Sequence, residues 1–116
     1  MDERRRHQRY DIQLGAEVNT ADRSFSAGTR DVSASGACLE SPYPLDETSF
    51  VMLNLHLVVD GIEDADFAPL TVRAQVQWTA ELEDLSAAWR HLAGLRFDGM
   101  NDDAKNWLEQ VIDRAD

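Results

Sequence analysis

The chain has 116 residues, 43% of them hydrophobic, which is enough for one domain with its own core. Its 22 acidic and 11 basic side chains give a formal net charge of −11, so the overall field would repel DNA, RNA and anionic membrane surfaces. The single cysteine, Cys38, excludes an internal disulfide, and no run approaches the roughly 18 apolar residues of a membrane span. We therefore expect a cytoplasmic protein that has neither a signal peptide nor a membrane helix.

Six stretches of the chain alternate apolar and polar residues, and this period of two predicts half-buried β-strands. In the clearest stretch every even position from Leu70 to Trp78 is apolar, so we expect the Trp78 side chain to belong to the core or to cap it. The predicted strands cover residues 12–18, 24–31, 36–40, 51–59, 70–79 and 92–97.

Near the C-terminus the apolar residues change to helical spacing, which predicts an amphipathic helix over residues 101–114. Asn101 or Asp102 can cap its first turn, and Asp103 is favoured there by the helix dipole. We expect the apolar stripe of this helix to pack on the sheet; its members are Ala104, Trp107, Leu108, Val111 and Ile112.

These elements predict a mainly β fold, a small closed or nearly closed barrel of six antiparallel strands with one C-terminal helix, because closure removes exposed strand edges. We expect a single domain that consists of an arginine-rich N-terminal arm (residues 1–9), the barrel (10–99) and the helix (101–114). Residues 61–66 are predicted to form a hairpin loop, and residues 81–89 a loop with at most a short helical turn.

Two polar motifs lie between or before the predicted strands. The first is an RxxxR spacing, Arg5 to Arg9, directly ahead of the first strand, and the second is a DxSxxG spacing that consists of Asp31, Ser33 and Gly36. In this order and on this pattern of strands, the two motifs resemble the PilZ domain, the bacterial receptor module for cyclic di-GMP. The resemblance covers nearly the whole chain, and it implies a six-stranded barrel with cyclic di-GMP as its ligand.

The resemblance also implies which residues contact that ligand. In PilZ domains the two motif arginines contact the guanine bases and phosphates, and the DxSxxG motif belongs to the barrel face on which the ligand sits. The position before RxxxR, here Arg4, influences whether one ligand or an intercalated pair binds, whereas Arg6 is a variable position. The implied ligand-binding residues are Arg4, Arg5, Arg9, Asp31, Ser33 and Gly36, with Arg96 as an additional candidate because it alternates outward from the last strand.

The chemistry of these side chains agrees with such a ligand. The planar guanidinium fork of arginine binds phosphate oxygens and matches the O6/N7 edge of guanine. An ionised Asp31 only accepts hydrogen bonds, so the N1 and N2 donors of guanine suit it, and Ser33 can donate to a phosphate or accept from a base. Gly36 would permit a positive φ or a close approach of the backbone to the ligand.

Simpler interpretations of the two motifs exist beside this one. The arginines could form an exposed basic tail, and the residues from Asp31 to Gly36 an ordinary Asx turn. We expect no enzyme, no metal and no cofactor, because His7, His56 and His91 are scattered and no nucleophile or metal-ligand motif occurs.

The leading hypothesis is a cyclic di-GMP receptor whose N-terminal arm changes conformation on ligand binding and thereby signals to a downstream protein partner. The alternative is a PilZ-like adaptor that binds proteins and no nucleotide. A third interpretation, an oligonucleotide-binding barrel, is opposed by the charge of −11.

Overall fold

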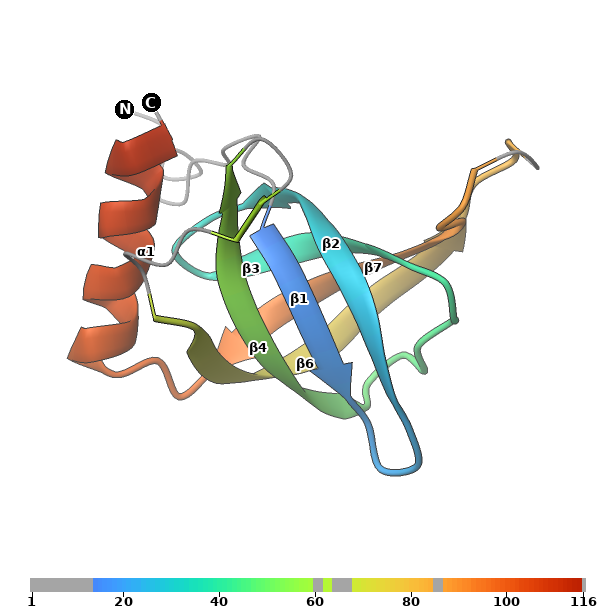
Figure 1. Cartoon of the computed structure of the whole chain (residues 1–116). Helices are drawn as coiled ribbons and strands as arrows, with labels where there is room; N and C mark the ends of the chain where they lie inside the picture. The colour runs from blue at the N-terminus through green and yellow to red at the C-terminus, as the bar shows by residue number, and fades with distance from the viewer. Residues whose placement is uncertain (1–13, 60–61, 64–67, 85–86, 116) are drawn as a thin grey trace, which may run out of the picture.

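The computed structural model describes residues 14–59, 62–63, 68–84 and 87–115 of the chain. Six antiparallel strands follow one another in the order β1-β2-β3-β7-β6-β4, and pairing of β1 with β4 closes them into a barrel (Figure 1). The strands are β1 (Leu14–Asn19), β2 (Ser24–Val32), β3 (Gly36–Ser41), β4 (Phe50–Val59), β6 (Leu70–Glu81) and β7 (His91–Asp98). The predicted six-stranded barrel and its C-terminal helix, α1 (Asp102–Ala115), are confirmed.

The connections differ from the prediction in detail. Within the predicted hairpin loop, a short strand, β5 (Ile62–Glu63), pairs with the end of β4. The described residues between β6 and β7 contain no helix and no strand, in agreement with the predicted loop, although β6 runs on to Glu81. The predicted arm and the start of the predicted first strand, residues 1–13, lie outside the described residues.

Alternate residues of each barrel strand point inward and form one continuous core, as the period of two predicts. The helix contributes Leu108 and Val111 to the same core, so it covers one side of the barrel. The large apolar side chains that are fully buried are Leu14, Leu39, Leu53, Leu55, Leu108, Val18, Val32, Val76 and Val111. The outward residues of the strands are therefore not needed for the core and are available for a site.

Trp78 departs from the prediction, because its side chain is 45% exposed and lies on the outer face of the barrel. A β-bulge in β6 causes the change: Val76 pairs with Leu95 and Trp78 with Gly94, so Gln77 is an extra residue between them. One extra residue moves every following side chain to the opposite face of the strand. The even positions from Val72 to Val76 are buried, and this burial is lost at Trp78.

The turn before β4 holds this bulge in place. The N–H of Thr48 donates to the carbonyl oxygen of Val76 at 2.8 Å, and the N–H of Val76 donates to the carbonyl oxygen of Ser49 at 2.9 Å. Thr48 reaches this position with a φ of 69°, a left-handed conformation that is strained for a β-branched residue. The turn thus supplies the hydrogen bonds that the backbone at the bulge does not make within the sheet.

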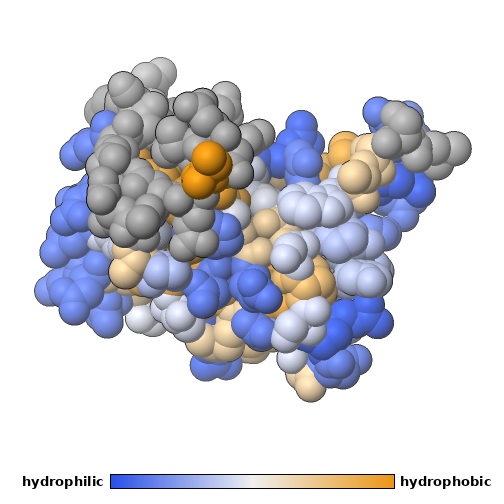
Figure 2. Space-filling model, in the orientation of Figure 1, coloured by the Kyte–Doolittle hydropathy of each residue, from blue (hydrophilic) through white to orange (hydrophobic). Residues whose placement is uncertain are grey.

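Helix α1 begins where its sequence predicts. The side-chain oxygen of Asn101 accepts a hydrogen bond from the N–H of Ala104 at 2.8 Å, so Asn101 is the N-cap, and Asp102 and Asp103 occupy the first turn. Trp107 is partly buried, and its indole N–H donates to the carbonyl oxygen of Ala68 at 2.7 Å. The outer side of α1 is hydrophilic (Figure 2), and no helix in the described part of the chain is long and apolar enough to cross a membrane.

Removal of the helix cap should cost a measurable part of the stability. We expect Asn101→Ala to lower the free energy of unfolding by about 1 kcal/mol, because the N–H of Ala104 loses its partner. Asn106→Ala is the matched control: this exposed residue lies in the middle of the same helix, where alanine is the better helix former. Urea denaturation of the three proteins measures both changes. An equal effect of the two substitutions would contradict the capping role of Asn101.

Candidate ligand-binding site

A row of four outward residues crosses neighbouring strands on the outer face of the barrel. Asp31 on β2 pairs with Cys38 on β3, Cys38 pairs with Gly94 on β7, and Gly94 pairs with Trp78 on β6. Because cross-strand partners place their side chains on the same face, a carboxylate, a thiol and an indole lie in one line. Gly94 leaves the space that the indole needs, since a Cβ at that position would overlap the indole ring of Trp78.

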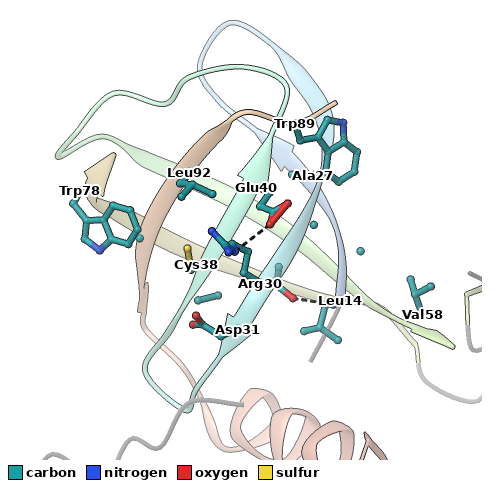
Figure 3. Close-up of a pocket in the computed structure, with 15 residues that line it drawn as sticks. Leu14, Ala27, Arg30, Asp31, Cys38, Glu40, Val58, Trp78, Trp89 and Leu92 are labelled. Atoms are coloured by element: carbon teal, nitrogen blue, oxygen red, sulfur yellow. Dashed lines mark hydrogen bonds and ion pairs between the residues drawn. The ribbon is translucent and has the colours of Figure 1, made fainter. Parts of the chain in front are cut away.

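This row forms part of a hollow of about 850 Å³, which falls within the usual range for a small-molecule site. Trp78 stands at one end of the hollow and Trp89 at the other, and Arg30 and Glu40 lie between them (Figure 3). Nε of Arg30 lies 3.2 Å from a carboxylate oxygen of Glu40. The hollow therefore combines aromatic walls with both signs of charge.

The DxSxxG motif forms the tight connection between β2 and β3. The N–H of Ser33 donates to the carbonyl oxygen of Gly36 at 2.8 Å, and the Ser33 hydroxyl accepts a hydrogen bond from the N–H of Ser35 at 3.2 Å. Ser33 is fully buried, and the carbonyl oxygen of Ser35 accepts a hydrogen bond from the N–H of Phe97 on β7 at 2.8 Å. Ser33 thus shapes the turn, and the turn is attached to the neighbouring strand.

Gly36 is required for a reason that differs from the expected one. It does not have a positive φ, which among the described glycines is found only at Gly99. A Cβ on Gly36 would instead overlap the backbone carbonyl of Leu95 and lie 3.3 Å from Cα of Arg96. The close approach is therefore between β3 and β7, and glycine allows the motif turn to pack directly on β7.

Arg96 lies on the same outer face as the motif. It pairs with Gly36 across β3 and β7, its side chain is exposed, and its guanidinium donates to the side-chain oxygen of Gln75 at 3.1 Å. Arg96 lines a second, smaller hollow of about 160 Å³. The other residues that line this smaller hollow are Ser35, Gly36, Gln77, Trp78, Gly94 and Leu95. Since the two hollows share Trp78 and Gly94, Arg96 is a neighbour of the larger one.

The remaining predicted site residues, Arg4, Arg5 and Arg9, lie outside the described residues. Leu14, the first described residue, lines the large hollow. Arg9 is five residues upstream of Leu14, so a fully extended chain brings it within about 18 Å of that point. The sequence distance therefore allows the arginines to reach Asp31.

Four residues that line the hollow were not predicted to belong to the site: Trp78, Trp89, Cys38 and Gly94. One signal could have found two of them. A glycine opposite an exposed aromatic residue on the neighbouring strand is a known pairing in β-sheets, and Gly94 faces Trp78 in that way. Trp89 gives no such signal, because it lies in the connection between β6 and β7.

Comparison with known families identifies the fold. The sequence matches the PilZ domain family over residues 3–114. The chain belongs to the PilZ domain family. No curated protein matches the sequence.

Solved structures of PilZ proteins have the same fold. The inhibitor of motility MotI/DgrA of Bacillus subtilis superposes with a TM-score of 0.72 at 14% identity, over 98% of this chain and 52% of that one. K. pneumonia MrkH in complex with c-di-GMP gives 0.70 at 15% identity, over 97% and 52%. The PilZ domain of Escherichia coli YcgR with c-di-GMP gives 0.71 at 16% identity, over 95% and 89%. The present chain thus spans about half the length of the first two proteins.

Substitution by alanine should change the free energy of unfolding by different amounts at Gly36 and at Gly94. We expect Gly36→Ala to lower the free energy of unfolding by about 2 to 3 kcal/mol, because the added Cβ meets the backbone of β7, which cannot move without breaking the barrel. Gly94→Ala should cost less than about 1 kcal/mol, since the partly exposed Trp78 indole can move away.

Chemical denaturation and tryptophan fluorescence test both expectations for the two glycine variants. The emission of Gly94→Ala should shift to longer wavelength as the Trp78 indole leaves the hollow and becomes hydrated. Equal destabilisation by the two substitutions, with unchanged emission, would show that Trp78 does not rest on Gly94.

Proposed function

We propose that this PilZ domain is a receptor for cyclic di-GMP that binds its ligand in the hollow beside Asp31. The observation that supports the proposal best is the position of the two motifs. Asp31 of the DxSxxG motif lies in the wall of the hollow, and Leu14 at the start of β1 lies in the same wall, five residues after Arg9 of the RxxxR motif in the sequence. The solved structures of the MrkH complex with c-di-GMP and of the YcgR PilZ domain with c-di-GMP have this fold.

The side chains of the hollow suit a guanine nucleotide. The Asp31 carboxylate can accept hydrogen bonds from N1 and N2 of guanine, and Arg5 and Arg9 can bind the phosphates and the opposite edge of a base. The exposed indole of Trp78 offers a flat surface on which a base can stack. Arg4 stands before the motif, where we propose that it favours a bound pair of ligands, and Arg96 is a further candidate contact.

These contacts are sufficient in magnitude. Hydrogen bonds to charged groups contribute roughly 1.5 to 3 kcal/mol each, and micromolar affinity requires about 8 kcal/mol. Four or five such bonds therefore provide micromolar binding even after the cost of ordering side chains and the arm is subtracted.

We further propose that ligand binding changes the conformation of the N-terminal arm and that a downstream protein partner recognises the changed surface. The arm carries the motif arginines, so their contacts with the ligand act directly on it. We propose a binding role for the domain and assign it no catalytic step, in line with its membership of the PilZ domain family.

Titration calorimetry with cyclic di-GMP tests the binding site. Arg9→Ala and Arg5→Ala should each weaken binding roughly 10- to 100-fold, because each loses charge-assisted hydrogen bonds. Arg6→Ala is the matched control, since it removes the same charge from a variable position of the motif and should bind within about threefold of the wild type. Absence of binding by the wild type at tens of micromolar ligand would refute the proposal.

Hydrogen exchange of residues 1–13 tests the change in the arm. Saturating cyclic di-GMP should slow exchange of these amides in the wild type and leave it unchanged in Arg9→Ala at the same ligand concentration. Binding without any effect on these amides would refute the change in the arm while leaving the receptor function intact.

A pull-down assay distinguishes the receptor from an adaptor that does not use nucleotide. A receptor should retain its protein partner to different extents with and without cyclic di-GMP, and Asp31→Ala should abolish that difference. Equal retention under both conditions, together with no effect of Arg9→Ala, would favour the adaptor.

A further inference from the structure

The connection between β6 and β7 carries a second tryptophan back to the outer face of the barrel. The N–H of Leu82 donates to the carbonyl oxygen of Arg90 at 2.7 Å, which closes the base of this connection. Trp89 directly precedes Arg90, so its position is fixed by this closure. Its indole lies 3.1 Å from the place that a Cβ on Gly28 would occupy, so the ring packs against the backbone of β2.

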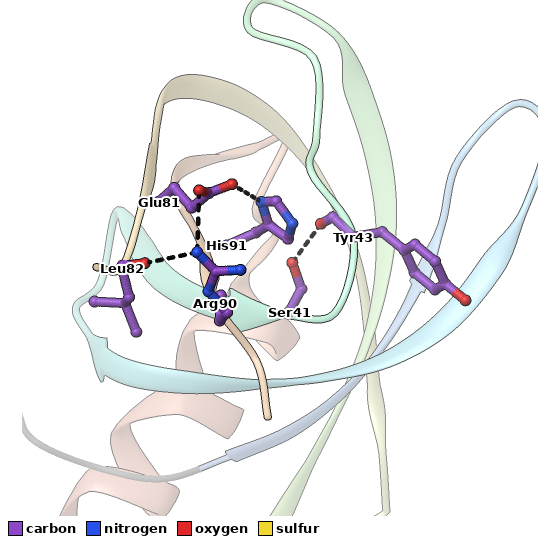
Figure 4. Close-up of polar contacts among 6 residues, drawn as sticks. All are labelled: Ser41, Tyr43, Glu81, Leu82, Arg90 and His91. Atoms are coloured by element: carbon purple, nitrogen blue, oxygen red, sulfur yellow. Dashed lines mark hydrogen bonds and ion pairs between the residues drawn. The ribbon is translucent and has the colours of Figure 1, made fainter. Parts of the chain in front are cut away.

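Polar contacts hold the base of the connection. A guanidinium nitrogen of Arg90 lies 3.3 Å from one carboxylate oxygen of Glu81 and 3.4 Å from the carbonyl oxygen of Leu82, and Nδ1 of His91 lies 3.7 Å from the other Glu81 oxygen (Figure 4). One carboxylate thus contacts two consecutive residues, Arg90 at the end of the connection and His91 at the start of β7. The contacts orient the chain that carries Trp89 without taking part in the hollow.

The two indoles line one hollow and rest on different strands. The Trp78 ring rests on Gly94 of β7 and the Trp89 ring on Gly28 of β2, and β3 lies between these strands. Gly28 pairs with Glu40 of β3 and Gly94 with Cys38 of β3, so the two glycines are two strands apart and offset by two residues. This arrangement separates them by about 12 Å. Rings at two such places suit a ligand that carries two planar groups.

A cation lies between the two aromatic walls. The guanidinium of Arg30 is located over β3, between the indoles (Figure 3), and Glu40 holds it through Nε. The two terminal nitrogens of a guanidinium carry four more N–H donors that suit phosphate oxygens. The order along the hollow is thus an aromatic ring, a cation and a second aromatic ring.

This order matches a cyclic dinucleotide, in which a ring with two phosphates separates two bases. We propose that Trp89 is a second stacking platform: one guanine of cyclic di-GMP lies on Trp78, the phosphate ring passes Arg30, and the second guanine lies on Trp89. The inference rests on the proposed receptor function and adds a residue that neither sequence motif contains. Base stacking on an aromatic side chain contributes roughly 1 to 3 kcal/mol per base.

Titration calorimetry of the full chain with cyclic di-GMP tests this platform. Trp89→Leu keeps an apolar side chain but loses the aromatic face, so it should weaken binding roughly 5- to 100-fold. Trp89→Phe keeps a ring and should bind within about fivefold of the wild type. Ala88→Ser, an exposed neighbour in the same connection, is the matched control and should bind as the wild type does.

Fluorine NMR of protein labelled with 5-fluorotryptophan separates a contact from an effect on folding. Trp78→Phe and Trp89→Phe assign the three resonances. Saturating ligand should shift the resonances of Trp78 and Trp89 and leave that of Trp107, which lies on α1, in place. In Trp89→Leu without ligand, the Trp78 and Trp107 resonances should keep their wild-type positions if the barrel is intact.

The possible outcomes distinguish the inference from the receptor function. Loss of affinity in Trp89→Leu together with a ligand-induced shift of Trp89 supports the platform. Wild-type affinity in Trp89→Leu, or an unshifted Trp89 resonance, would overturn it, and the receptor function would stand if Arg9→Ala still weakened binding. No binding by the wild type would overturn both.

Discussion

Two backbone hydrogen bonds between Val76 and the turn before β4 determine the character of the outer face. They hold an extra residue in β6, and that residue turns Trp78 from the core to the surface. Without the bulge, the alternation of β6 would bury the indole, and the hollow would lose one of its walls. The strained φ of Thr48 is part of the same arrangement, because the turn must bring its N–H and the Ser49 carbonyl to one strand residue.

Close backbone packing gives the rest of the site its rigidity. Gly36 allows β3 to approach β7 so closely that no side chain fits between them, and the Ser35 carbonyl oxygen bonds to Phe97 on the same strand. The fully buried Ser33 fills the inside of the turn. The motif therefore stabilises the fold in the first place, and Asp31 is its member that lines the hollow. A turn attached in this way holds its carboxylate in one place, which lowers the cost of binding.

The sequence predicts well those features that depend on neighbouring residues. The alternation of apolar residues locates the six barrel strands, helical spacing locates α1, and the structure decides for Asn101 between the two candidate caps. Trp78 was placed wrongly because its bulge depends on Thr48, about thirty positions away, and no local pattern records that contact. For Trp89 the sequence favours a core or barrel-cap position over a stacking platform, because nothing local indicates that the connection turns this side chain toward the hollow. The motif spacing indicates the position of Asp31, but the walls opposite it arise only when four strands are assembled.

The distribution of charge explains how an acidic chain can accept an anionic ligand. The net charge of −11 acts on long polyanions, which extend over the whole surface, whereas screening limits each charge to about 8 to 10 Å in physiological salt. A small ligand of the proposed kind would therefore respond to Arg30 in the hollow and to Arg96 nearby, and much less to acidic residues elsewhere on the surface. Arg30 reaches this position because Glu40 holds it on the neighbouring strand. The same carboxylate that weakens the local positive charge thus fixes the direction of the guanidinium, which favours a ligand of defined shape over any anion of equal charge.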